Sequence, residues 1–486
     1  MAAVMFQGTG SDVGKSVIVA GVCRALVNRG LTVRPFKPQN MSNNAAVAAD
    51  GGEIGRAQAL QAIACRVPAS VHMNPVLIKP QSDIGAQLVI RGVVRGTVDA
   101  GYFRQHKAEL LEIVLESFGR LSREADIVVV EGAGSPAESN LRAHDIANMG
   151  FARAARVPVV LIGDIDRGGV IAALVGTSTL LSRQDRAMIK AFIINKFRGD
   201  ISLFESGVAE ITRRTSWPSL GVVPWLAAAR TLPAEDAVTL NAPAATPGAL
   251  RIVVPLLPHI ANFDDFDALM QDSGASLQLI PPGTALPGDA KVVIIPGTKA
   301  TIADLKFLRR QGWDIDIAAH VRRGGHVVGI CGGFQMLGSS ITDPEGMEGP
   351  VESVDGLDLL PMDTYLMKTK QVGEVRGIHI DSGAVFDGYE IHAGQTRLEP
   401  GLTPWLRFDD GSAAGAIRAD GLVAGCYVHG LYNRAEFRGA WLESLGVSSD
   451  RVQQHQRIDA ALDELAAVLE RSVDLDRLLD IARCSA

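Results

Sequence analysis

Short apolar runs recur along the first half of the chain, and each is followed by glycine or polar residues and then by a helix-like stretch. Clear examples lie within Ala3–Gln7, Ile127–Val130 and Val157–Ile162. A continuously apolar strand is typical of a parallel sheet, because helices cover both of its faces. The alternation of strands and helices therefore predicts a doubly wound α/β domain over residues 1–226, whose last strand lies near Gly221–Trp225.

A second series of the same kind begins at Arg251, after a stretch over residues 227–249 that is rich in alanine and proline. That composition is typical of a linker. Apolar runs such as Val292–Ile295 predict a second doubly wound α/β domain over residues 250–448. From residue 449 on, apolar residues at helical spacing predict an amphipathic helical tail that packs on the domain; they include Ala460, Leu462, Leu465, Ala466, Val468 and Leu469.

Composition places the chain among soluble globular enzymes. It has 486 residues, of which 47% are hydrophobic and 21% charged, so two or more domains are expected. The formal charge of −7 argues against a general nucleic-acid binder. No signal-like start and no apolar run of membrane-spanning length is found, so we expect a cytoplasmic protein without membrane or nucleic-acid partners. The sequence indicates no oligomeric state.

Five cysteines are present, an odd number without any C-x-x-C pair, so neither a disulfide framework nor a structural zinc site is indicated. One of them, Cys331, stands where the apolar strand Val327–Ile330 breaks into Gly332 and Gly333 before a helix. This strand-turn-helix context presents a nucleophile on a sharp turn. Glycines relieve the clashes of such a turn, and the amide of Gly332 would point at an oxyanion. A buried structural cysteine is the alternative, but it needs no glycine pair.

A thiolate nucleophile needs a base, and His429 is the best candidate. It ends another short strand, Val423–Val428, and is followed by Gly430. Alone, such a histidine is more often a surface or core residue. Together with the elbow at Cys331, it predicts a nucleophile and base pair.

The N-terminal strand leads into a phosphate-binding loop that opens a helix. Successive backbone amides would cradle phosphates, Lys15 would reach the β and γ oxygens, and the Ser16 hydroxyl would hold Mg²⁺. The position of the usual first glycine, counted back from Gly14, is Thr9, while Gly8 lies one residue earlier. The loop is therefore longer by one residue than the common form.

Further polar residues follow the predicted strands. Ligands bind outside the carboxyl ends of strands in such folds, so we expect these residues near a nucleotide or substrate. Glu131 would face the γ-phosphate and a metal, although a helix-capping or solvated role is the alternative. The other candidates for substrate or phosphate contact are Lys37, Asp164, Asp166 and Arg167.

The longer phosphate loop resembles that of dethiobiotin synthetase and its relatives, which phosphorylate a carboxylate. This resemblance implies ATP as a cosubstrate and Mg²⁺ held by Ser16, Glu131 and the Asp in the position of Asp50. It also implies that Asn195 reads the adenine. From the residues alone, Asp50 could equally cap the helix that follows it.

The elbow at Cys331 and the strand-end His429 resemble a class I, triad-type glutamine amidotransferase. In that family the cysteine attacks the side-chain amide of glutamine and releases ammonia, and the resemblance implies that the Gly297 amide is a second oxyanion donor. The usual Glu two residues after the histidine is replaced by Leu431. The cobyric acid and cobyrinic acid a,c-diamide synthases show this departure, which leaves His429 without an identified orienting partner.

The chain thus resembles the family of those corrinoid synthases over nearly its whole length, notably in Phe36–Ser42, Asp50–Gln61, Met73–Pro80 and Gly388–Gly394. The resemblance implies ATP- and glutamine-dependent amidation of the b, d, e and g side-chain carboxylates of adenosylcobyrinic acid a,c-diamide, a C–N ligase reaction of cobalamin biosynthesis. Contacts with the corrinoid stay open, and Glu390 and His392 suit either substrate contact or packing. The basic residues that could meet its carboxylates are Lys79, Arg91, Arg142 and Arg167.

Three alternatives stand beside this interpretation. One is the sister reaction, amidation of only the a and c carboxylates of cobyrinic acid. Another is a regulatory phosphate-loop ATPase of the partition type that carries an inactive amidotransferase-like module. The third is a glutamine-dependent synthetase acting on an unrelated acid, such as a cell-wall carboxylate.

Overall fold

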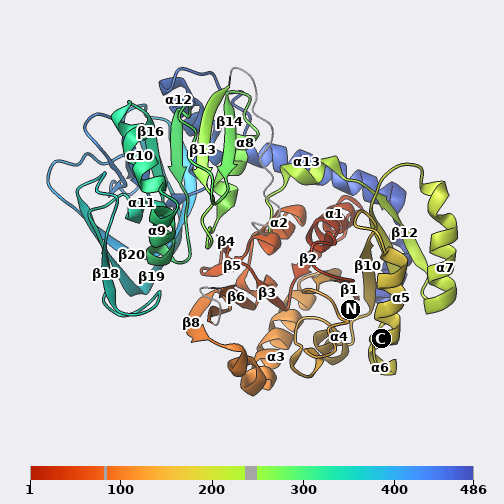
Figure 1. Cartoon of the computed structure of the whole chain (residues 1–486). Helices are drawn as coiled ribbons and strands as arrows, with labels where there is room; N and C mark the ends of the chain where they lie inside the picture. Colours follow the sequence, from red (N-terminus) through yellow and green to blue (C-terminus); the bar gives the residue numbers. More distant parts are fainter. Residues whose placement is uncertain (1, 81–84, 236–248, 485–486) are drawn as a thin grey trace. The chain divides into compact units, whose positions relative to one another are not determined.

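The polypeptide divides into two units, whose elements are labelled in Figure 1. The computed structural model describes residues 2–80, 85–235 and 249–484. The first unit contains the chain up to Ser42, the segment Ala48–Glu235 and the chain from Ile458 on, and the second contains residues 43–47 and the described residues 249–457. Of the expected linker, residues 227–235 belong to the first unit, and residues 236–248 lie outside the described part of the chain.

A six-stranded, all-parallel sheet forms the centre of the first unit. Side chains of the strand Ala2–Gly8 point alternately into two cores, with Val4 and Phe6 on one face and Ala3 and Met5 on the other. This is the buried strand that the apolar run predicts. In order across the sheet the strands are β12 (Ser219–Pro224), β11 (Ile189–Phe197), β10 (Val159–Asp164), β1 (Ala2–Gly8), β9 (Ile127–Glu131) and β2 (Val33–Phe36).

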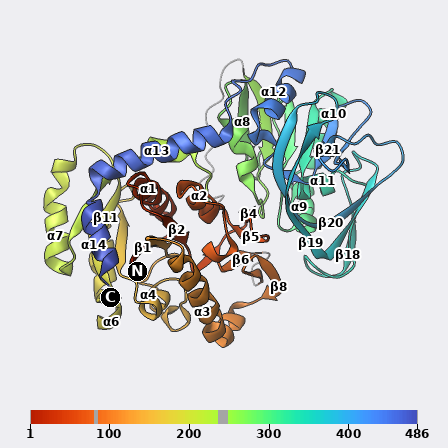
Figure 2. The ribbon, with the colours of Figure 1, turned by 180° about the vertical axis from the view of Figure 1, so that it is seen from behind.

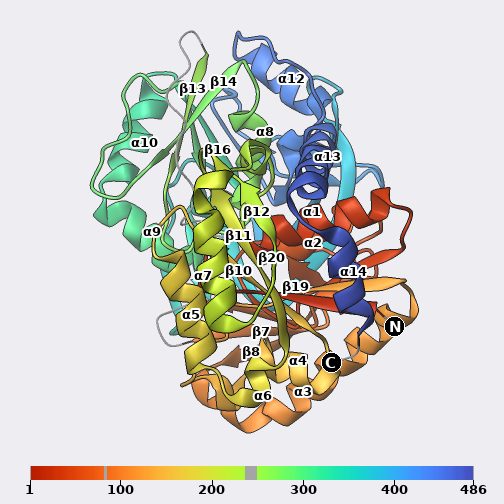
Figure 3. The same cartoon turned by 90° about the vertical axis from the view of Figure 1, so that its right-hand side faces the viewer.

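Helices cover both faces of this sheet, as a doubly wound fold requires. Figure 3 shows α5 and α7 side by side on one face, where α3 and α4 also pack. The opposite face is covered by α1, α2 and the C-terminal helices. The helices are α1 (Lys15–Asn28), α2 (Arg56–Ala64), α3 (Ala100–Arg123), α4 (Met149–Ala155), α5 (Val170–Leu180), α6 (Arg183–Arg186), α7 (Glu205–Thr215), α13 (Gln454–Ser472) and α14 (Leu475–Arg483).

A smaller mixed sheet stands beside the central one in the first unit. Its strands are β3 (Gln39–Met41), β6 (Val76–Pro80), β7 (Ala86–Ile90) and β8 (Val93–Val98), and β5 (Glu53–Gly55) lies in the same unit. This sheet was not expected from the sequence, because β3 has only three residues and β8 is largely exposed, so neither forms a buried apolar run.

The C-terminal helices belong to the core of the first unit. Figures 1 and 2 both show the blue helix α13 beside α1. Leu465 and Leu469 are fully buried in that core. A Cβ at Gly21 would lie only 2.6 Å from Leu469 Cδ1, so the glycine permits this close packing. Arg24, 1% exposed, donates to Asp459 Oδ1 at 2.6 Å, which ties α1 to α13 by charge as well.

Truncation of this contact should destabilise the nucleotide-binding unit specifically. We expect Leu465→Ala to lower the free energy of unfolding of the first unit by about 2–5 kcal/mol, because it removes a buried side chain and leaves a cavity. Glu464→Ala, exposed on the same helix, should change it by less than about 0.5 kcal/mol. Urea titration measures both. An equal effect of the two changes would contradict the packing of α13 in this core.

The second unit also has a six-stranded sheet, parallel except for its edge strand β23. This confirms the second α/β series. In order the strands are β14 (Ala275–Ile280), β13 (Leu250–Pro255), β15 (Val292–Ile295), β16 (His326–Ile330), β24 (Val423–Cys426) and β23 (Ala416–Ile417), with helices α8 (Asp267–Met270), α9 (Thr301–Arg310), α10 (Trp313–Arg322), α11 (Gly332–Met336) and α12 (Ala435–Ser444).

A second, mostly antiparallel sheet completes this unit and was not expected from the sequence. It is built on a long hairpin whose strands alternate between half-exposed polar and buried residues, so no apolar run marks them. Its strands are β17 (Ser340–Asp343), β18 (Glu352–Asp355), β19 (Met362–His379), β20 (Val385–Leu398), β21 (Leu406–Phe408), β22 (Ala413–Ala414) and β25 (Val428–His429).

The short segment 43–47, which contains β4 (Ala45–Val47), packs within the second unit although it lies between two parts of the first in the sequence. Ala45 N donates to Asn262 Oδ1 at 3.1 Å, and Phe263 N donates to Asn44 Oδ1 at 3.3 Å. Ala45 also packs on the hairpin residue Tyr389. In the described part of the chain, no helix has the length and apolar character needed to cross a membrane.

Candidate active sites

Cys331 lies on a strained turn between β16 and α11, as the sequence predicts. Its backbone has φ 51° and ψ −109°, a conformation that few non-glycine residues adopt. A Cβ at Gly333 would lie 2.0 Å from Ile295 O, so this position requires glycine. Cys331 N donates to Cys426 O at 2.8 Å, which anchors the turn to the neighbouring strand β24.

The predicted nucleophile, base and oxyanion donors meet at this turn. A Cβ at Gly297 would lie 3.0 Å from His429 Cε1 and 3.7 Å from Cys331 Cβ. A Cβ at Gly332 would lie 3.1 Å from Thr298 N, so the two predicted oxyanion glycines are neighbours as well. Ala261 N donates to Gly297 O at 2.9 Å and thereby fixes the peptide that precedes Thr298.

Asp265 is the residue that the sequence interpretation missed, and it orients His429. His429 Nδ1 lies 2.8 Å from Asp265 Oδ2, and Gly430 N donates to Asp265 Oδ1 at 2.6 Å. Both side chains are 2% exposed. The carboxylate lies on a 3₁₀ turn, Phe263–Phe266, in an acid-rich stretch that the sequence analysis did not connect with the histidine 164 residues further on. Asp265 therefore orients His429, as the glutamate that is replaced here by Leu431 would otherwise do.

The electrostatics of this group favour a charged imidazole. Burial opposes the imidazolium, but the charges of Asp265 and Cys331 outweigh it and raise the pKa of His429 to about 10. The ring of Tyr389 stacks on the imidazole with a centroid separation of 5.3 Å, which fixes its plane. An imidazolium beside a cysteine stabilises the thiolate, the nucleophilic form of that side chain.

Asp265→Asn should disable this group. The folded-state pKa of His429 lies above its ordinary value, so the ion pair stabilises the fold below pH 6.5 and this contribution is lost as the pH rises through about 10. Without the carboxylate the pKa of His429 falls, and the imidazolium is depleted at neutral pH. We expect glutaminase activity to drop by roughly 10²- to 10⁴-fold, with a pH profile shifted to lower pH.

Glutamate release at several pH values measures this effect. Ammonium-supported activity of the same variant is the control, because it does not use Cys331. A wild-type pH profile in Asp265→Asn would contradict the positioning role.

The phosphate-binding loop lies between β1 and α1, as predicted. A Cβ at Gly8 would lie 2.6 Å from Val13 Cγ2, and Gly14 adopts φ 90° at the start of the helix, so both positions require glycine. Lys15 Nζ donates to Gly10 O at 3.1 Å across the loop. The Thr9 amide donates to Ile162 O at 2.9 Å and ties the loop to β10.

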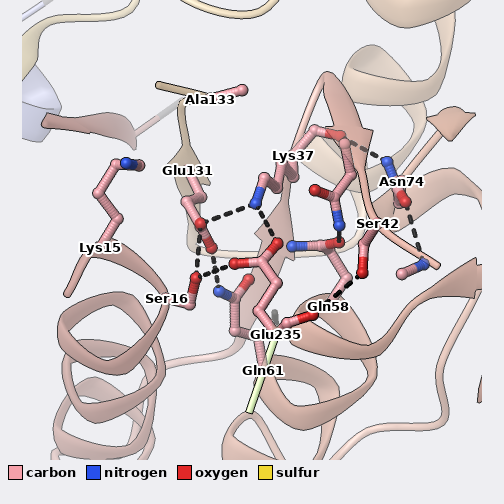
Figure 4. A network of polar contacts seen from close by, with 12 residues as sticks. Lys15, Ser16, Lys37, Ser42, Gln58, Gln61, Asn74, Glu131, Ala133 and Glu235 are labelled. Atoms are coloured by element: carbon pink, nitrogen blue, oxygen red, sulfur yellow. Dashed lines mark hydrogen bonds and ion pairs between the residues drawn. The ribbon is translucent and has the colours of Figure 1, made fainter. Parts of the chain in front are cut away.

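Two carboxylates, a hydroxyl and an ammonium converge beside this loop (Figure 4). Ser16 Oγ lies 2.8 Å from Glu131 Oε1 and 2.7 Å from Glu235 Oε2. Lys37 Nζ lies 2.9 Å from Glu131 Oε1 and 2.6 Å from Glu235 Oε1. Gln61 Nε2 donates to the other oxygen of Glu131 at 2.5 Å. Three predicted residues thus lie together, and Glu235, which no sequence pattern singles out, completes the group.

Charge pairing sets the ionisation of these side chains. Burial disfavours the Lys37 ammonium, but Glu131 and Glu235 outweigh it and raise its pKa. Burial likewise opposes the Glu235 carboxylate, but the charge of Lys37 dominates and lowers its pKa. Burial lowers the pKa of Lys15; the charge of Glu131 opposes this shift, and the charge of Lys37 adds to it.

Asp50 makes its hydrogen bonds elsewhere. Its carboxylate accepts from Ser70 Oγ at 2.6 Å and from Val71 N at 3.0 Å, at the start of the 3₁₀ turn Val71–Met73. The alternative role, a cap on the helix that follows Asp50, is also wrong, because α2 begins at Arg56 with Gly55 as its N-cap residue. The structure brings Glu235 rather than Asp50 beside Ser16 and Glu131.

Asn195 and Asp164 lie at the carboxyl ends of β11 and β10. Asn195 Nδ2 donates to Val13 O at 2.8 Å, so this side chain supports the phosphate loop. Asp164 pairs with Lys196 at 2.7 Å. Asn195 therefore contacts the loop directly, and Asp164 acts on it through Lys196, whose Nζ also donates to Asp12 O at 2.5 Å.

The remaining basic and acidic candidates are in ion pairs. Asp166 pairs with Arg198 at 2.8 Å, while Arg167, whose side chain is 69% exposed, lies 3.5 Å from Asp12 of the phosphate loop. The three other basic candidates pair as follows: Lys79 with Glu53, Arg91 with Glu116 and Arg142 with Asp185.

A cavity of about 390 Å³ opens in the second unit beside α11, the helix that follows Cys331. Its lining includes Phe334, Glu390, His392 and Tyr427. His392 stacks on Tyr427 with centroids 3.7 Å apart, and its Nδ1 lies 2.9 Å from Gly394 O. Cys331 Sγ lies 3.7 Å from the carbonyl oxygen of Ile391, the residue between Glu390 and His392 in β20. The cavity and the nucleophile thus share the strand β20, although Cys331 is not among the residues that line the cavity.

Comparisons with known proteins match both halves of the chain. Residues 4–240 match the family of CobQ/CobB/MinD/ParA nucleotide-binding domains, and residues 251–437 match the CobB/CobQ-like glutamine amidotransferase domains. Relatives named cobyric acid synthase match 99% of this chain. That of Caulobacter sp. (strain K31) is 61% identical over 484 residues and is covered completely, and those of Sphingopyxis alaskensis and Brucella anthropi are 59% and 57% identical, each covered to 99%.

Proposed function

Because this chain belongs to the cobyric acid synthase family, we propose that it amidates the b, d, e and g side-chain carboxylates of adenosylcobyrinic acid a,c-diamide, with ATP and glutamine. The observation that carries the proposal is the meeting of Cys331, His429 and Asp265 in a chain that also holds a phosphate-binding loop. One group releases ammonia and the other activates the acceptor carboxylate.

The chemistry of the acceptor explains why the two groups belong together. A carboxylate is a poor electrophile, so ATP converts it to an acyl phosphate, from which ammonia displaces phosphate to give the amide. Ammonia at neutral pH is mostly ammonium, which is no nucleophile. Its release from glutamine by the same enzyme supplies the reactive form.

In the glutaminase reaction, the Cys331 thiolate attacks the side-chain carbonyl carbon of glutamine. The amides of Gly297 and Gly332 hold the oxyanion that forms. His429 gives its proton to the departing nitrogen, so ammonia leaves and a thioester remains. It then takes a proton from water, which attacks the thioester and releases glutamate. Asp265 holds the imidazole in the orientation needed for both transfers.

In the synthetase reaction, the amides of the phosphate loop and Lys15 bind the triphosphate. The donors beside the loop fit Mg²⁺, because the Ser16 hydroxyl and the Glu131 carboxylate are hard oxygen ligands. When bound, this ion neutralises charge on the phosphates. Lys37 is a cation within the same group and is placed to steady the acceptor carboxylate or the transferred phosphoryl group.

The cavity beside the elbow fits glutamine. Its volume exceeds the size of one amino acid, and the Glu390 carboxylate on its wall offers a partner for the α-ammonium group. We therefore assign Glu390 to glutamine binding. The stacked ring of His392 then packs in the wall of the cavity. Of the two roles that the sequence left open, substrate contact thus falls to Glu390 and packing to His392.

Glu390→Gln should raise the KM for glutamine by roughly 10- to 100-fold, the effect of losing one hydrogen bond to a charged group. Ammonium-supported amidation should stay at the wild-type rate. Glu374→Gln, an exposed carboxylate on the partner strand β19, is the matched control. An unchanged KM in Glu390→Gln would contradict this assignment.

Mass spectrometry of the corrinoid tests the function itself. With Mg-ATP and glutamine, we expect four successive losses of about one mass unit, one for each carboxylate converted to an amide. Cys331→Ala should abolish them with glutamine, and ammonium should restore them, because only the glutaminase reaction needs the thiol.

The alternatives give different results in the same assay. Two amidations of cobyrinic acid, and none of the a,c-diamide, would establish the sister reaction. Glutamine-independent ATP hydrolysis without any change in corrinoid mass would establish the regulatory ATPase. Inactivity towards both corrinoids, with glutamine-dependent ATP turnover on another acid, would establish an unrelated synthetase.

A further inference from the structure

The Ser16 hydroxyl has one hydrogen but contacts two carboxylates. Ser16 Oγ is within 2.8 Å of Glu131 Oε1 and within 2.7 Å of Glu235 Oε2, but a hydroxyl has a single hydrogen to donate. An ionised carboxylate can accept hydrogen bonds but cannot donate one. One of the two contacts therefore brings two oxygens together without a hydrogen between them, an arrangement that favours a positive ion.

Access to the two acids suits a ligand that enters together with the nucleotide. The two carboxylates share one ammonium, that of Lys37 (Figure 4). The Glu131 side chain is fully buried and that of Glu235 is 21% exposed, so the pair is reached from the side of Glu235. Lys15 is a second cation near both acids, so their charges are balanced, and an entering cation would be held by ligation to the carboxylate oxygens rather than by excess negative charge.

A buried acceptor beside the acids is also unsatisfied. Gln61 is fully buried, and while its Nε2 donates to Glu131, its Oε1 has no hydrogen-bond partner in the part of the chain that the structure describes. Buried amide oxygens are usually paired, so this atom requires a donor from a ligand or a bound water. Water carried by a metal ion supplies such a donor.

The backbone around Glu235 is also held in place. Ser42 Oγ donates to its carbonyl oxygen at 3.1 Å, and Leu232, three residues earlier and 5% exposed, is anchored in the core of the first unit. The position of the carboxylate beside Ser16 thus follows from backbone contacts as well as from its pairing with Lys37.

We propose that Glu235 is a carboxylate ligand of the divalent cation that accompanies the nucleotide, together with Ser16 and Glu131. The proposal rests on the proposed use of ATP. It replaces Asp50, whose carboxylate caps the turn at Val71, in the expected ligand set. Three oxygens from one hydroxyl and two carboxylates suit Mg²⁺, which keeps water in its remaining positions. In the described residues no group of three acids, histidines or cysteines is placed to hold a metal, and the proposed set accordingly consists of two carboxylates and one hydroxyl.

Metal affinity tests this assignment without reliance on turnover. Mn²⁺ takes the place of Mg²⁺ as a paramagnetic probe, and its binding to the full-length protein with a non-hydrolysable ATP analogue is followed by electron paramagnetic resonance. We expect Glu235→Gln to weaken Mn²⁺ binding by about 10-fold or more, while binding of the analogue without metal is kept. Asp50→Asn, the matched variant, should bind Mn²⁺ as the wild type does and melt at a lower temperature because it loses a cap.

The opposite pattern overturns the proposal. Unchanged Mn²⁺ affinity in Glu235→Gln, with a lowered melting temperature, would make Glu235 a structural partner of Lys37 alone. Tighter Mn²⁺ or nucleotide binding in that variant would make Glu235 an occupant that the ligand must displace. Weaker Mn²⁺ binding in Asp50→Asn would restore Asp50 to the site.

The result is separable from the proposed function. If Mn²⁺ and the analogue bind, and Glu235→Gln weakens the metal, the inference stands even when the corrinoid remains unchanged in mass. If the corrinoid is amidated but Glu235→Gln leaves the metal affinity unchanged, the function stands and the inference fails. Loss of secondary structure in Glu235→Gln is checked by circular dichroism, and Glu235→Asp, which keeps the charge, should recover part of the metal affinity.

Discussion

Burial of charge is the constraint on which both sites depend. Glu131 is fully buried, and Lys37, Asp265 and His429 are 2–3% exposed. An unpaired ion in such a position costs several kcal/mol, so each must find a partner of opposite charge. Lys37 pairs with Glu131 across 94 residues, and His429 with Asp265 across 164. Neither pair can form before its unit has folded, so the fold and the site are assembled together.

Pairing also explains how these groups remain chemically useful. A buried cation that is held by carboxylates keeps its charge at neutral pH, as the raised pKa values of Lys37 and His429 show. Lys37 is then ready to meet a phosphate or carboxylate, and His429 is ready to give a proton. In each case a bound ligand or a reaction intermediate then replaces part of the charge pairing that carboxylates of the protein supply.

Local patterns in the sequence account for what could be predicted. The phosphate loop, the elbow at Cys331 and the buried parallel strands each show in a few consecutive residues, because glycine spacing and apolar runs have direct backbone consequences. His429 was found because it ends a strand. The hairpin of β19 and β20 was missed, since half-exposed strands alternate polar and apolar residues over a long and irregular stretch.

Asp265 and Glu235 could not be found in this way. Each is a single acid in a turn or irregular segment, among many acids in the chain, and its role depends on a partner far away in the sequence. Asp50 shows the converse, because an acid that resembles a metal ligand in the sequence is a turn cap in the structure. Cap and ligand positions both favour aspartate, so residue type alone does not separate them.

Transfer of ¹⁸O from the acceptor carboxylates to phosphate is the measurement that reports on carboxylate activation. In the proposed reaction, the first unit activates a carboxylate as an acyl phosphate, which ammonia from the second unit then converts to an amide. With a corrinoid labelled with ¹⁸O in its carboxylates, each amide formed should release one labelled oxygen in inorganic phosphate. Amide formation with the label in AMP, or with unlabelled phosphate only, would contradict activation by phosphoryl transfer.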